Sequence, residues 1–188
     1  MGAEIVGADL RALSDVAFRQ IHNAFVTYQV IAIRDQRLTP ADQLAFSRLF
    51  GPLEDQLNAH YTVENYPEVL ILSNDIKDGK PVGLIDGGDF WHSDSSFKKT
   101  PSLCSVLTAR VCPPEGGNTE FLSMRAAWNA LPAALKATIS TLVAEHSLQY
   151  SRDRVQKGIL NDRTLKELPP VKQRLFQDNP VNSRRALF

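Results

Sequence analysis

The sequence predicts one domain of 188 residues with a mostly antiparallel β core and helices around it. Short apolar runs such as residues 30–33 have the length and the β-branched content of strands. Segments 14–28 and 39–50 instead show helical spacing with capping residues at their starts. Residues 90–122 contain the longest strand-like stretches, which favours a β core over a helical bundle.

A short strand within residues 3–10 is expected to open the chain, and a helix follows it. Ser14 is suited to cap this helix, because its side-chain oxygen can accept a hydrogen bond from an unpaired amide of the first turn. The helix runs to about Tyr28. Its apolar side chains recur on one face at helical spacing: Ala17, Ile21 and Phe25.

Residues 30–33 are expected to form a short buried strand, and a second helix starts after them. Thr39 stands at the capping position and Pro40 at the first helical position, a pair typical of helix starts. This helix ends at a Gly-Pro pair, residues 51–52, and a further strand is expected at residues 68–73.

Residues 75–89 contain four glycines among charged residues, which indicates a loop of the kind that can close over a site. Beyond it, strands are expected at 90–97, 102–112 and 119–122, helices at 123–130 and 132–144, and a polar surface segment at 151–170. Residues 185–188 resemble a strand that has only begun, so the β core is expected to be incomplete at the C-terminus.

Composition argues against several classes of protein. Lys and Arg number 21, and so do Asp and Glu, so neither a nucleic-acid-binding surface nor a basic membrane-binding patch is expected. The apolar runs are far shorter than the ~18 residues of a membrane span. Cys104 and Cys112 lie on one expected strand, too far apart for a disulfide. Reduced cysteines packed as small apolar residues fit a cytoplasmic protein.

The strongest chemical signal is the pair His92 and Asp94. On a strand, residues two apart project from the same face, so an imidazole and a carboxylate could chelate one metal ion. A second histidine would complete the two-histidine, one-carboxylate triad of non-haem iron(II) oxygenases. Alone, the tripeptide of residues 92–94 is weak evidence for a metal site, because a surface pair or a capping pair is the common explanation of such a sequence. The other histidines lack such spacing and are interpreted as a surface residue, His60, and as structural residues, His22 and His146.

Further motifs extend this pattern along essentially the whole chain. They are residues 2–5 (GAEI), 33–36 (IRDQ), 46–53 (FSRLFGPL), 91–97 (WHSDSSF), 109–121 (ARVCPPEGGNTEF) and 124–128 (MRAAW). Together they resemble the TauD/TfdA family of iron(II)/2-oxoglutarate-dependent dioxygenases, and its TfdA (2,4-dichlorophenoxyacetate) branch more than its taurine branch. The resemblance implies a single dioxygenase domain over residues 1–188, corresponding to the N-terminal two-thirds of a double-stranded β-helix (jelly roll) of the clavaminate synthase type.

The resemblance also implies roles for individual residues. His92 and Asp94 match the first two iron ligands, and Trp91 is expected to pack behind His92. Thr119 matches the threonine that hydrogen-bonds a carboxylate of 2-oxoglutarate, and the glycines before it permit the tight turn that presents its hydroxyl. Substrate contacts are expected from Asn58, His60, Lys80 and Phe90. For Lys80, a solvated lysine on a mobile loop is the plainer interpretation.

The implied reaction uses O2 and 2-oxoglutarate to hydroxylate a small anionic organic acid, aryloxyalkanoate-like or sulfonate-like, with succinate and CO2 as co-products. The resemblance leaves the substrate and the oligomeric state open, although dimers and tetramers are common in the family. The alternative is a truncated, non-catalytic member that binds a ligand or a partner without turnover. A cupin-like metal protein of other chemistry is disfavoured by the retained Gly-Gly-Asn-Thr turn at 116–119.

The chain departs from the family pattern towards its C-terminus. Residues 178–184 (DNPVNSR) stand where the family usually has Thr-His-Pro-x-Thr-Gly-Arg. The family's distal histidine ligand and its 2-oxoglutarate-binding arginine correspond to positions beyond 188. Three explanations stay open: a fragment of a longer enzyme, a naturally short paralogue, or a site completed by a partner subunit or by an internal histidine, His60 or His146.

Overall fold

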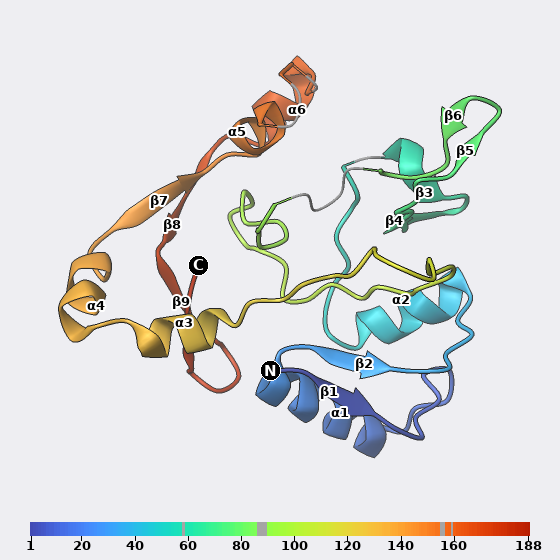
Figure 1. The fold of residues 1–188 in the computed structure, drawn as a ribbon, viewed down its shortest axis with the longest axis horizontal. Coiled ribbons are helices and arrows are strands. Elements are labelled where there is room, and N and C mark those ends of the chain that lie inside the picture. The colour runs from blue at the N-terminus through green and yellow to red at the C-terminus, as the bar shows by residue number, and fades with distance from the viewer. Residues whose placement is uncertain (58, 86–89, 155–156, 159) are drawn as a thin grey trace. The chain divides into compact units, whose positions relative to one another are not determined.

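The computed structural model describes all residues except 58, 86–89, 155–156 and 159. The chain forms two compact units, and each is described by itself. Unit 1 comprises Met1–His92 and Leu103–Gly117, and unit 2 comprises Ser93–Ser102 and Asn118–Phe188. Figure 1 labels most of their helices and strands, numbered in chain order.

Unit 1 begins with two parallel strands joined by a helix. Strand β1 (Ala3–Ile5) pairs in parallel with β2 (Ile31–Ile33), and α1 (Asp15–Tyr28) connects them and contacts both. Figure 1 shows α1 running along this strand pair. The Ser14 hydroxyl accepts a hydrogen bond from the Ala17 amide at 3.2 Å, which confirms the predicted helix cap.

The second helix of unit 1, α2 (Pro40–Arg48), has a complete capping box. The Asp42 amide donates to the Thr39 hydroxyl at 3.2 Å, and the Thr39 amide donates to the Asp42 carboxylate at 2.8 Å. The hydroxyl also donates to that carboxylate at 2.7 Å. The two hydrogen bonds that the Asp42 carboxylate accepts, from the Thr39 hydroxyl and amide, lower the pKa of Asp42. The capping box and Pro40 confirm the helix start that the sequence predicts.

The core of unit 1 lies between these helices and the parallel strands. Its buried members come from four separate stretches of the N-terminal part: Leu10, Ile21, Leu38 and Phe46. Val106, far along the chain, packs against this core, and its carbonyl oxygen accepts from the Gln43 side-chain amide at 3.1 Å. This hydrogen bond attaches the second stretch of unit 1 to α2.

The rest of unit 1 consists of small antiparallel elements. The 3-10 turn η1 (Ala59–Tyr61) leads into β3 (Thr62–Val63), which pairs with β4 (Tyr66–Leu70). The strand predicted at 68–73 therefore exists but lies earlier in the chain. The predicted loop at 75–89 contains a hairpin of β5 (Ile76–Lys77) and β6 (Lys80–Pro81), while its residues 86–89 lie outside the described part.

Unit 2 is built from short helices and two antiparallel strand pairs. Its helices are α3 (Met124–Ala130), α4 (Ala133–Ile139), α5 (Leu148–Asp153) and α6 (Asp162–Glu167). Strand β7 (Val143–His146) pairs with β8 (Val171–Arg174), and β9 (Phe176–Asp178) pairs with β10 (Arg185–Leu187). Strand β10 confirms the strand predicted at the end of the chain.

A cluster around Arg185 holds β9, β10 and α3 together. The Arg185 guanidinium donates to both carboxylate oxygens of Asp178, at 2.7 and 3.0 Å, and lies 4.3 Å from the centre of the Phe176 ring. The Trp128 ring of α3 lies 5.3 Å from that of Phe176. Two charge-assisted hydrogen bonds and two aromatic faces thus stabilise the strand pair against its helix.

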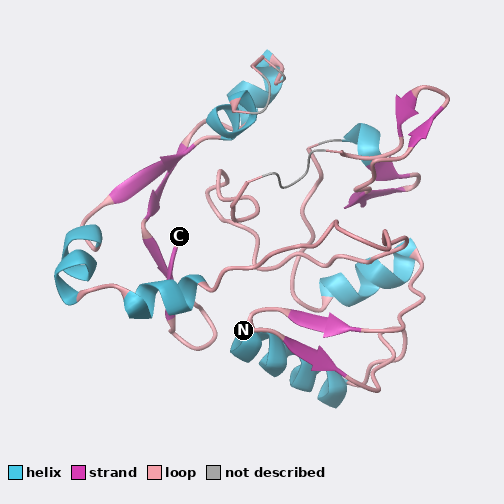
Figure 2. Ribbon diagram, in the orientation of Figure 1, coloured by secondary structure: helices cyan, strands magenta, loops and turns pink. Residues whose placement is uncertain are grey.

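The predicted strands at 90–97, 102–112 and 119–122 are wrong. Over residues 90–122, all of which the structure describes, the backbone forms no strand. A strand needs a partner for its amides and carbonyls, and prolines in this region supply no amide. Two-stranded sheets and helices therefore replace the single large β core that was expected (Figure 2).

Two predictions for the C-terminal half also need correction. The helix expected at 132–144 ends at Ile139, because Ser140 and Thr141 bond back to the carbonyls of Lys136 and Thr138 at 2.6 and 3.0 Å. Strand β7 follows instead. The polar segment at 151–170 is not only a surface excursion, because α5 ends in it and α6 forms within it, capped by Asn161.

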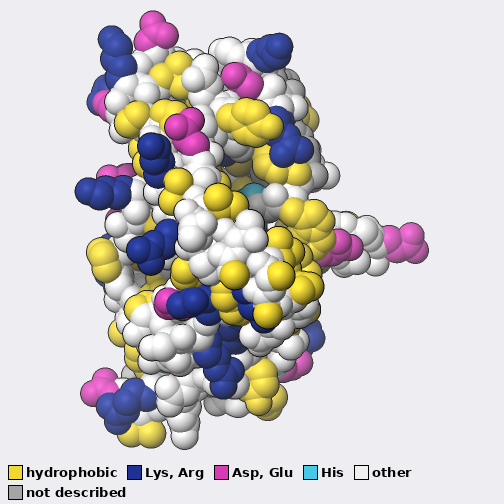
Figure 3. Space-filling model, turned by 90° about the vertical axis from the view of Figure 1, so that its left-hand side faces the viewer, with side chains coloured by type: hydrophobic (Ala, Val, Ile, Leu, Met, Phe, Trp, Pro, Cys, Tyr) yellow, Lys and Arg dark blue, Asp and Glu magenta, His cyan; other side chains and the backbone are white. Residues whose placement is uncertain are grey.

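The surface carries charges of both signs. Figure 3 shows basic, acidic and apolar side chains interspersed over the face that it displays. Within the described residues, every helix is too short or too polar to cross a membrane.

Candidate metal-binding residues

His92 lies on an irregular, exposed stretch at the end of the first segment of unit 1. Its Nδ1 atom is 2.8 Å from the carbonyl oxygen of Phe90. Because a carbonyl only accepts hydrogen bonds, the neutral imidazole carries its proton on Nδ1 and its lone pair on Nε2. The same arrangement orients metal-binding histidines in many proteins, so the ring is suited to ligation through Nε2.

Asp94 belongs to unit 2 and opens a turn over residues 94–97. Ser95 has a φ of 53°, in the left-handed region, and its carbonyl accepts from the Lys98 amide at 2.9 Å. Alternation along a strand therefore does not relate His92 to Asp94, and that part of the sequence argument is wrong. The exposed carboxylate of Asp94 is instead presented by a turn.

Thr119 follows the glycine turn as predicted, but it does not start a strand. Gly116 and Gly117 have φ values of 76° and 65°, which side-chain-bearing residues rarely adopt. A Cβ on Gly117 would also lie 3.2 Å from the Cγ of Pro113. The tight turn thus depends on both glycines, and the exposed Thr119 lies two residues beyond it.

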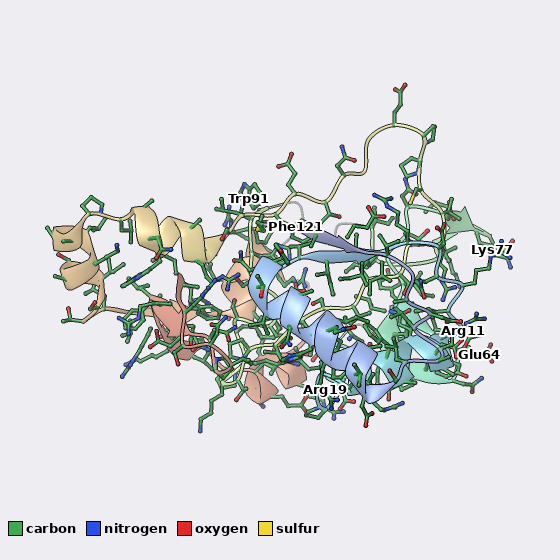
Figure 4. All side chains as sticks on the ribbon, turned by 90° about the horizontal axis from the view of Figure 1, so that it is seen from below. Arg11, Arg19, Glu64, Lys77, Trp91 and Phe121 are labelled. Carbon is green, nitrogen blue, oxygen red and sulfur yellow. The ribbon has the colours of Figure 1, made fainter. Side chains whose placement is uncertain are left out.

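Trp91 does not pack behind His92, and this expectation is corrected. Its side chain is 65% exposed (Figure 4), and the ring beside His92 is that of Phe90. The centres of the Phe90 and His92 rings are 6.0 Å apart at an interplanar angle of 66°. Phe90, half-buried, therefore contacts the candidate ligand and supplies the carbonyl that orients it.

The remaining predicted substrate residues lie apart in the chain. Asn58 lies outside the described residues. His60 is exposed on η1, and Lys80 is exposed on β6, paired in register with Lys77 (labelled in Figure 4). The structure thus places Lys80 on a hairpin, where its side chain is solvated.

Two other histidines have structural surroundings, as predicted. His22 of α1 lies 6.0 Å from Phe18 and 6.1 Å from Phe50, ring centre to ring centre. His146 of β7 stacks on Phe188 at 5.3 Å and 12°. Among the described residues, no group of three His, Cys, Asp or Glu side chains is arranged to hold a metal ion. His92 and Asp94 therefore supply at most two protein ligands.

The cysteines confirm one prediction and correct another. Both are free thiols, although the strand from which their separation was predicted does not form. Cys104 is partly buried, and burial raises the pKa of its thiol. Cys112 is exposed, so it is not packed as a small apolar residue.

Gln173 is a residue that the sequence interpretation missed. It is 7% exposed on β8, and its side-chain amide bonds to backbone carbonyls next to the Asp94 turn. A glutamine two positions after Val171, on the side of β8 that faces inward, was the available signal.

Comparison with known proteins decides the family. The sequence model described as "Taurine catabolism dioxygenase TauD, TfdA family" matches residues 1–188. The chain belongs to this family. The resemblance inferred from the motifs is therefore confirmed.

Two curated TauD/TfdA relatives are each 36% identical to the chain. One is the alpha-ketoglutarate-dependent 2,4-dichlorophenoxyacetate dioxygenase of Cupriavidus pinatubonensis, with 99% of this chain aligned to 69% of that protein. The other is the (S)-phenoxypropionate/alpha-ketoglutarate-dioxygenase of Sphingobium herbicidovorans, with 100% of this chain aligned to 66% of that protein. The chain thus spans about two thirds of the length of these relatives.

Solved structures of the family resemble the chain as well. The structure of AAD-2 in complex with Mn(II) and N-oxalylglycine is 36% identical, with a TM-score of 0.75 over 99% of this chain and 64% of that one. A taurine dioxygenase from Burkholderia xenovorans is 26% identical, with a TM-score of 0.76 over 100% of this chain and 59% of that one. The fold of the chain is therefore that of the corresponding part of these structures.

Proposed function

We propose that this protein is an iron(II)/2-oxoglutarate-dependent dioxygenase that hydroxylates a small organic acid of the aryloxyalkanoate or sulfonate type. The observation that carries the proposal is the oriented His92 imidazole, two residues before Asp94, in a chain 36% identical to two aryloxyalkanoate dioxygenases. A single dioxygenase domain with a double-stranded β-helix is part of the proposal, since the family match spans residues 1–188. The free thiols support a cytoplasmic location.

The chemistry of the donor set fits iron(II). A neutral imidazole and a carboxylate are two members of the two-histidine, one-carboxylate set that iron(II) oxygenases use. The Phe90 carbonyl sets the His92 tautomer that ligation requires. Iron(II) with 2-oxoglutarate, when bound, supplies the oxidation by O2 that yields succinate and CO2.

Each candidate residue then has a defined task. His92 donates the Nε2 lone pair, and Asp94 contributes a carboxylate oxygen and a negative charge. Thr119 donates its hydroxyl proton to a carboxylate of 2-oxoglutarate, presented by the glycine turn before it. For the substrate, Lys80 and His60 offer cationic or hydrogen-bonding groups to an organic anion, and Phe90 offers an apolar surface.

Asn58 completes the substrate-binding set in this proposal. Its amide can donate to a carboxylate or accept from a hydroxyl of the substrate. The proposal assigns no third protein ligand, because His22 and His146 pack against aromatic rings. The oligomeric state is left unassigned.

Anaerobic visible absorption with iron(II) and 2-oxoglutarate tests the proposal. A charge-transfer band is expected when the 2-oxo acid chelates the bound metal, and His92→Ala and Asp94→Asn should both lose it. His146→Ala is the matched control, because that imidazole stacks on Phe188 and should leave the band unchanged. A folded wild-type protein without a band, or a band that survives His92→Ala, would overturn the proposal.

A second candidate is a family member that binds an organic acid without turnover. For this candidate, His92 and Asp94 are exposed residues on irregular backbone rather than neighbours on one face of a strand. Calorimetric binding of 2-oxoglutarate or phenoxyacetate to the metal-free protein, together with no charge-transfer band, is the result that this candidate predicts.

A further inference from the structure

Gln173 is the one polar side chain that is buried in the part of the chain that the structure describes. It lies on β8, which pairs with β7 through backbone hydrogen bonds, and its register partner is Ala144. The amide side chain is not needed for that pairing. A buried amide requires hydrogen-bond partners, so the location of those partners indicates what the residue does.

The partners of Gln173 lie in the segment that carries Asp94. Its Nε2 donates to the Lys98 carbonyl at 2.9 Å and lies 3.4 Å from the Ser96 carbonyl. Ser96 is two residues after Asp94 and 77 before Gln173, and Lys98 is four residues after Asp94 and 75 before Gln173. One side chain therefore connects β8 to the Asp94 turn within unit 2.

The Asp94 turn needs such support. Residues 93–102 belong to no strand or helix, so no regular hydrogen-bond ladder fixes their backbone. Ser95 is held at a φ of 53°, a conformation that persists only when surrounding contacts enforce it. The Lys98 amide donates to the Ser95 carbonyl at 2.9 Å, which closes the turn. The Gln173 side chain then attaches this turn to β8 through the Lys98 carbonyl.

We propose that Gln173 is a positioning residue for the Asp94 carboxylate. By fixing the carbonyls of Ser96 and Lys98 it fixes the backbone turn, and the turn fixes where Asp94 projects. The inference rests on the proposed function, in which Asp94 is a metal ligand. Partners that orient metal ligands change metal affinity by about 10- to 100-fold when they are removed, and a similar effect is expected here.

The variant Gln173→Met tests this role, since it keeps the length of the side chain and removes both donors. Mn(II), the metal in the AAD-2 structure, serves as the probe, and electron paramagnetic resonance measures the free ion during titration of the full chain. We expect Mn(II) affinity to fall by about 10- to 100-fold. Gln173→Asn, one methylene shorter, keeps an amide at the site but cannot reach Lys98, and the same direction is expected.

Trypsin supplies a readout that needs no metal. Lys98 and Lys99 are cleavage sites in the segment that Gln173 holds, and Lys77 is one in the β5–β6 hairpin of unit 1. We expect Gln173→Met to accelerate cleavage at Lys98 and Lys99 and to leave the rate at Lys77 unchanged. Mass spectrometry of the early fragments separates these sites.

Val171→Ala is the matched control on the same strand. Val171 pairs with His146 in register, and its apolar side chain offers no hydrogen-bond donor to the Asp94 turn. Its truncation should therefore lower the melting temperature without changing Mn(II) affinity. Equal loss of affinity in Val171→Ala and Gln173→Met would reduce Gln173 to a structural residue. Faster cleavage at Lys98 with unchanged Mn(II) affinity would likewise overturn the positioning role.

If the proposed function is wrong, the Mn(II) and trypsin results differ from those expected when only the positioning role fails. If wild-type protein binds no Mn(II) in a manner that depends on His92 and Asp94, the metal site itself is refuted. The trypsin result then still decides whether Gln173 holds the turn. Unchanged cleavage at Lys98 in a folded Gln173→Met protein would overturn that contact whatever the metal does.

Discussion

The Nδ1 atom of His92 and the carbonyl oxygen of Phe90 are 2.8 Å apart, and both belong to one short stretch of backbone. This hydrogen bond is therefore local, because it joins residues two apart and involves no distant element. The Phe90 ring, 6.0 Å from the imidazole centre, adds a side-chain contact to the same residue. The two contributions of Phe90 can be separated, because substitution changes only its side chain.

Replacing Phe90 by Ala should weaken Mn(II) binding by less than about tenfold, because the carbonyl that orients His92 stays in place. His92→Ala should remove binding altogether. The measurement is a titration of Mn(II) followed by electron paramagnetic resonance. Trp91→Ala is the matched control, since its 65% exposed side chain is expected to leave the affinity unchanged. A Phe90→Ala loss as large as that of His92→Ala would show that the ring, rather than the carbonyl, fixes the imidazole.

Acid should weaken unit 1 through Asp9. The Arg11 side chain donates two hydrogen bonds to this carboxylate, at 3.0 and 2.8 Å, and the Arg11 amide donates one at 3.0 Å. Together they lower the pKa of Asp9 to about 2. Because the folded pKa is below the unfolded value of about 3.9, the stabilisation is present above pH ~4 and is lost as the pH falls towards 2.

Urea unfolding midpoints between pH 5 and pH 2 measure this contribution. The wild type should lose stability more steeply than Asp9→Asn, and Arg11→Met, which keeps only the amide hydrogen bond to Asp9, should fall between them. Both groups are exposed, so the difference is expected to be small and to shrink in 1 M salt (Debye length about 3 Å). Parallel pH profiles for wild type and Asp9→Asn at low salt would contradict the prediction.

The elements that were predicted correctly are those whose signals are local. The caps Ser14 and Thr39 bond to amides three residues away, so the sequence of a single turn contains the information. The stretch at 102–112 has strand-like composition but no partner strand, and composition does not reveal pairing. Its place in unit 1 instead depends on the hydrogen bond between Gln43 and Val106, 63 residues apart.

The same distinction applies to the candidate site. His92 and Asp94 are proposed as ligands from residue type and family motif, which need no three-dimensional information. The role of Phe90 in orienting His92 depends on one backbone conformation, and that of Gln173 on a contact across 75 residues. Strand alternation could have marked Gln173 as an inward-facing polar residue, but the partners of Gln173 and of His92 are revealed only by the folded chain.

The Phe50 ring should be a major source of stability in unit 1. It meets the rings of Phe18, Phe25 and Phe46 edge to face, with centres 5.2, 5.8 and 5.4 Å apart. Phe50→Ala removes these contacts and leaves a void, and because Phe50 is only partly buried we expect a loss of about 2–4 kcal/mol in the free energy of unfolding. Urea denaturation followed by circular dichroism measures it.

Two control variants show whether the loss of stability in Phe50→Ala comes from the aromatic contacts. Phe50→Leu keeps most of the apolar volume and should cost less than the alanine variant. Val6→Ala, at a side chain that is 86% exposed, should change stability by no more than about 0.5 kcal/mol. Equal effects of Phe50→Ala and Val6→Ala would mean that the aromatic cluster contributes little.

Gly83 is required because the backbone segment at residues 71–73 approaches it closely. A Cβ at this position would lie 2.7 Å from the Ile71 carbonyl oxygen and 2.9 Å from the Ser73 amide nitrogen. These atoms bond to Leu84, whose amide donates to Ile71 at 2.8 Å and whose carbonyl accepts from Ser73 at 3.3 Å. An added methyl group therefore cannot be accommodated without separating the two segments.

Gly83→Ala should consequently destabilise the protein by about 1–3 kcal/mol, the usual cost of forcing a methyl group into a filled space. Gly79→Ala separates this effect from backbone strain. Gly79 has a φ of 73°, and a Cβ added there would meet nothing within 4 Å, so its alanine variant should cost only the ~1–2 kcal/mol of a left-handed alanine. Limited trypsin cleavage after Lys77, in the β5–β6 hairpin that joins the two segments, gives a local readout: it should accelerate in Gly83→Ala as the segments at 71–73 and 83–84 separate. A Gly83→Ala protein with wild-type stability and cleavage would show that the close approach is not maintained in solution.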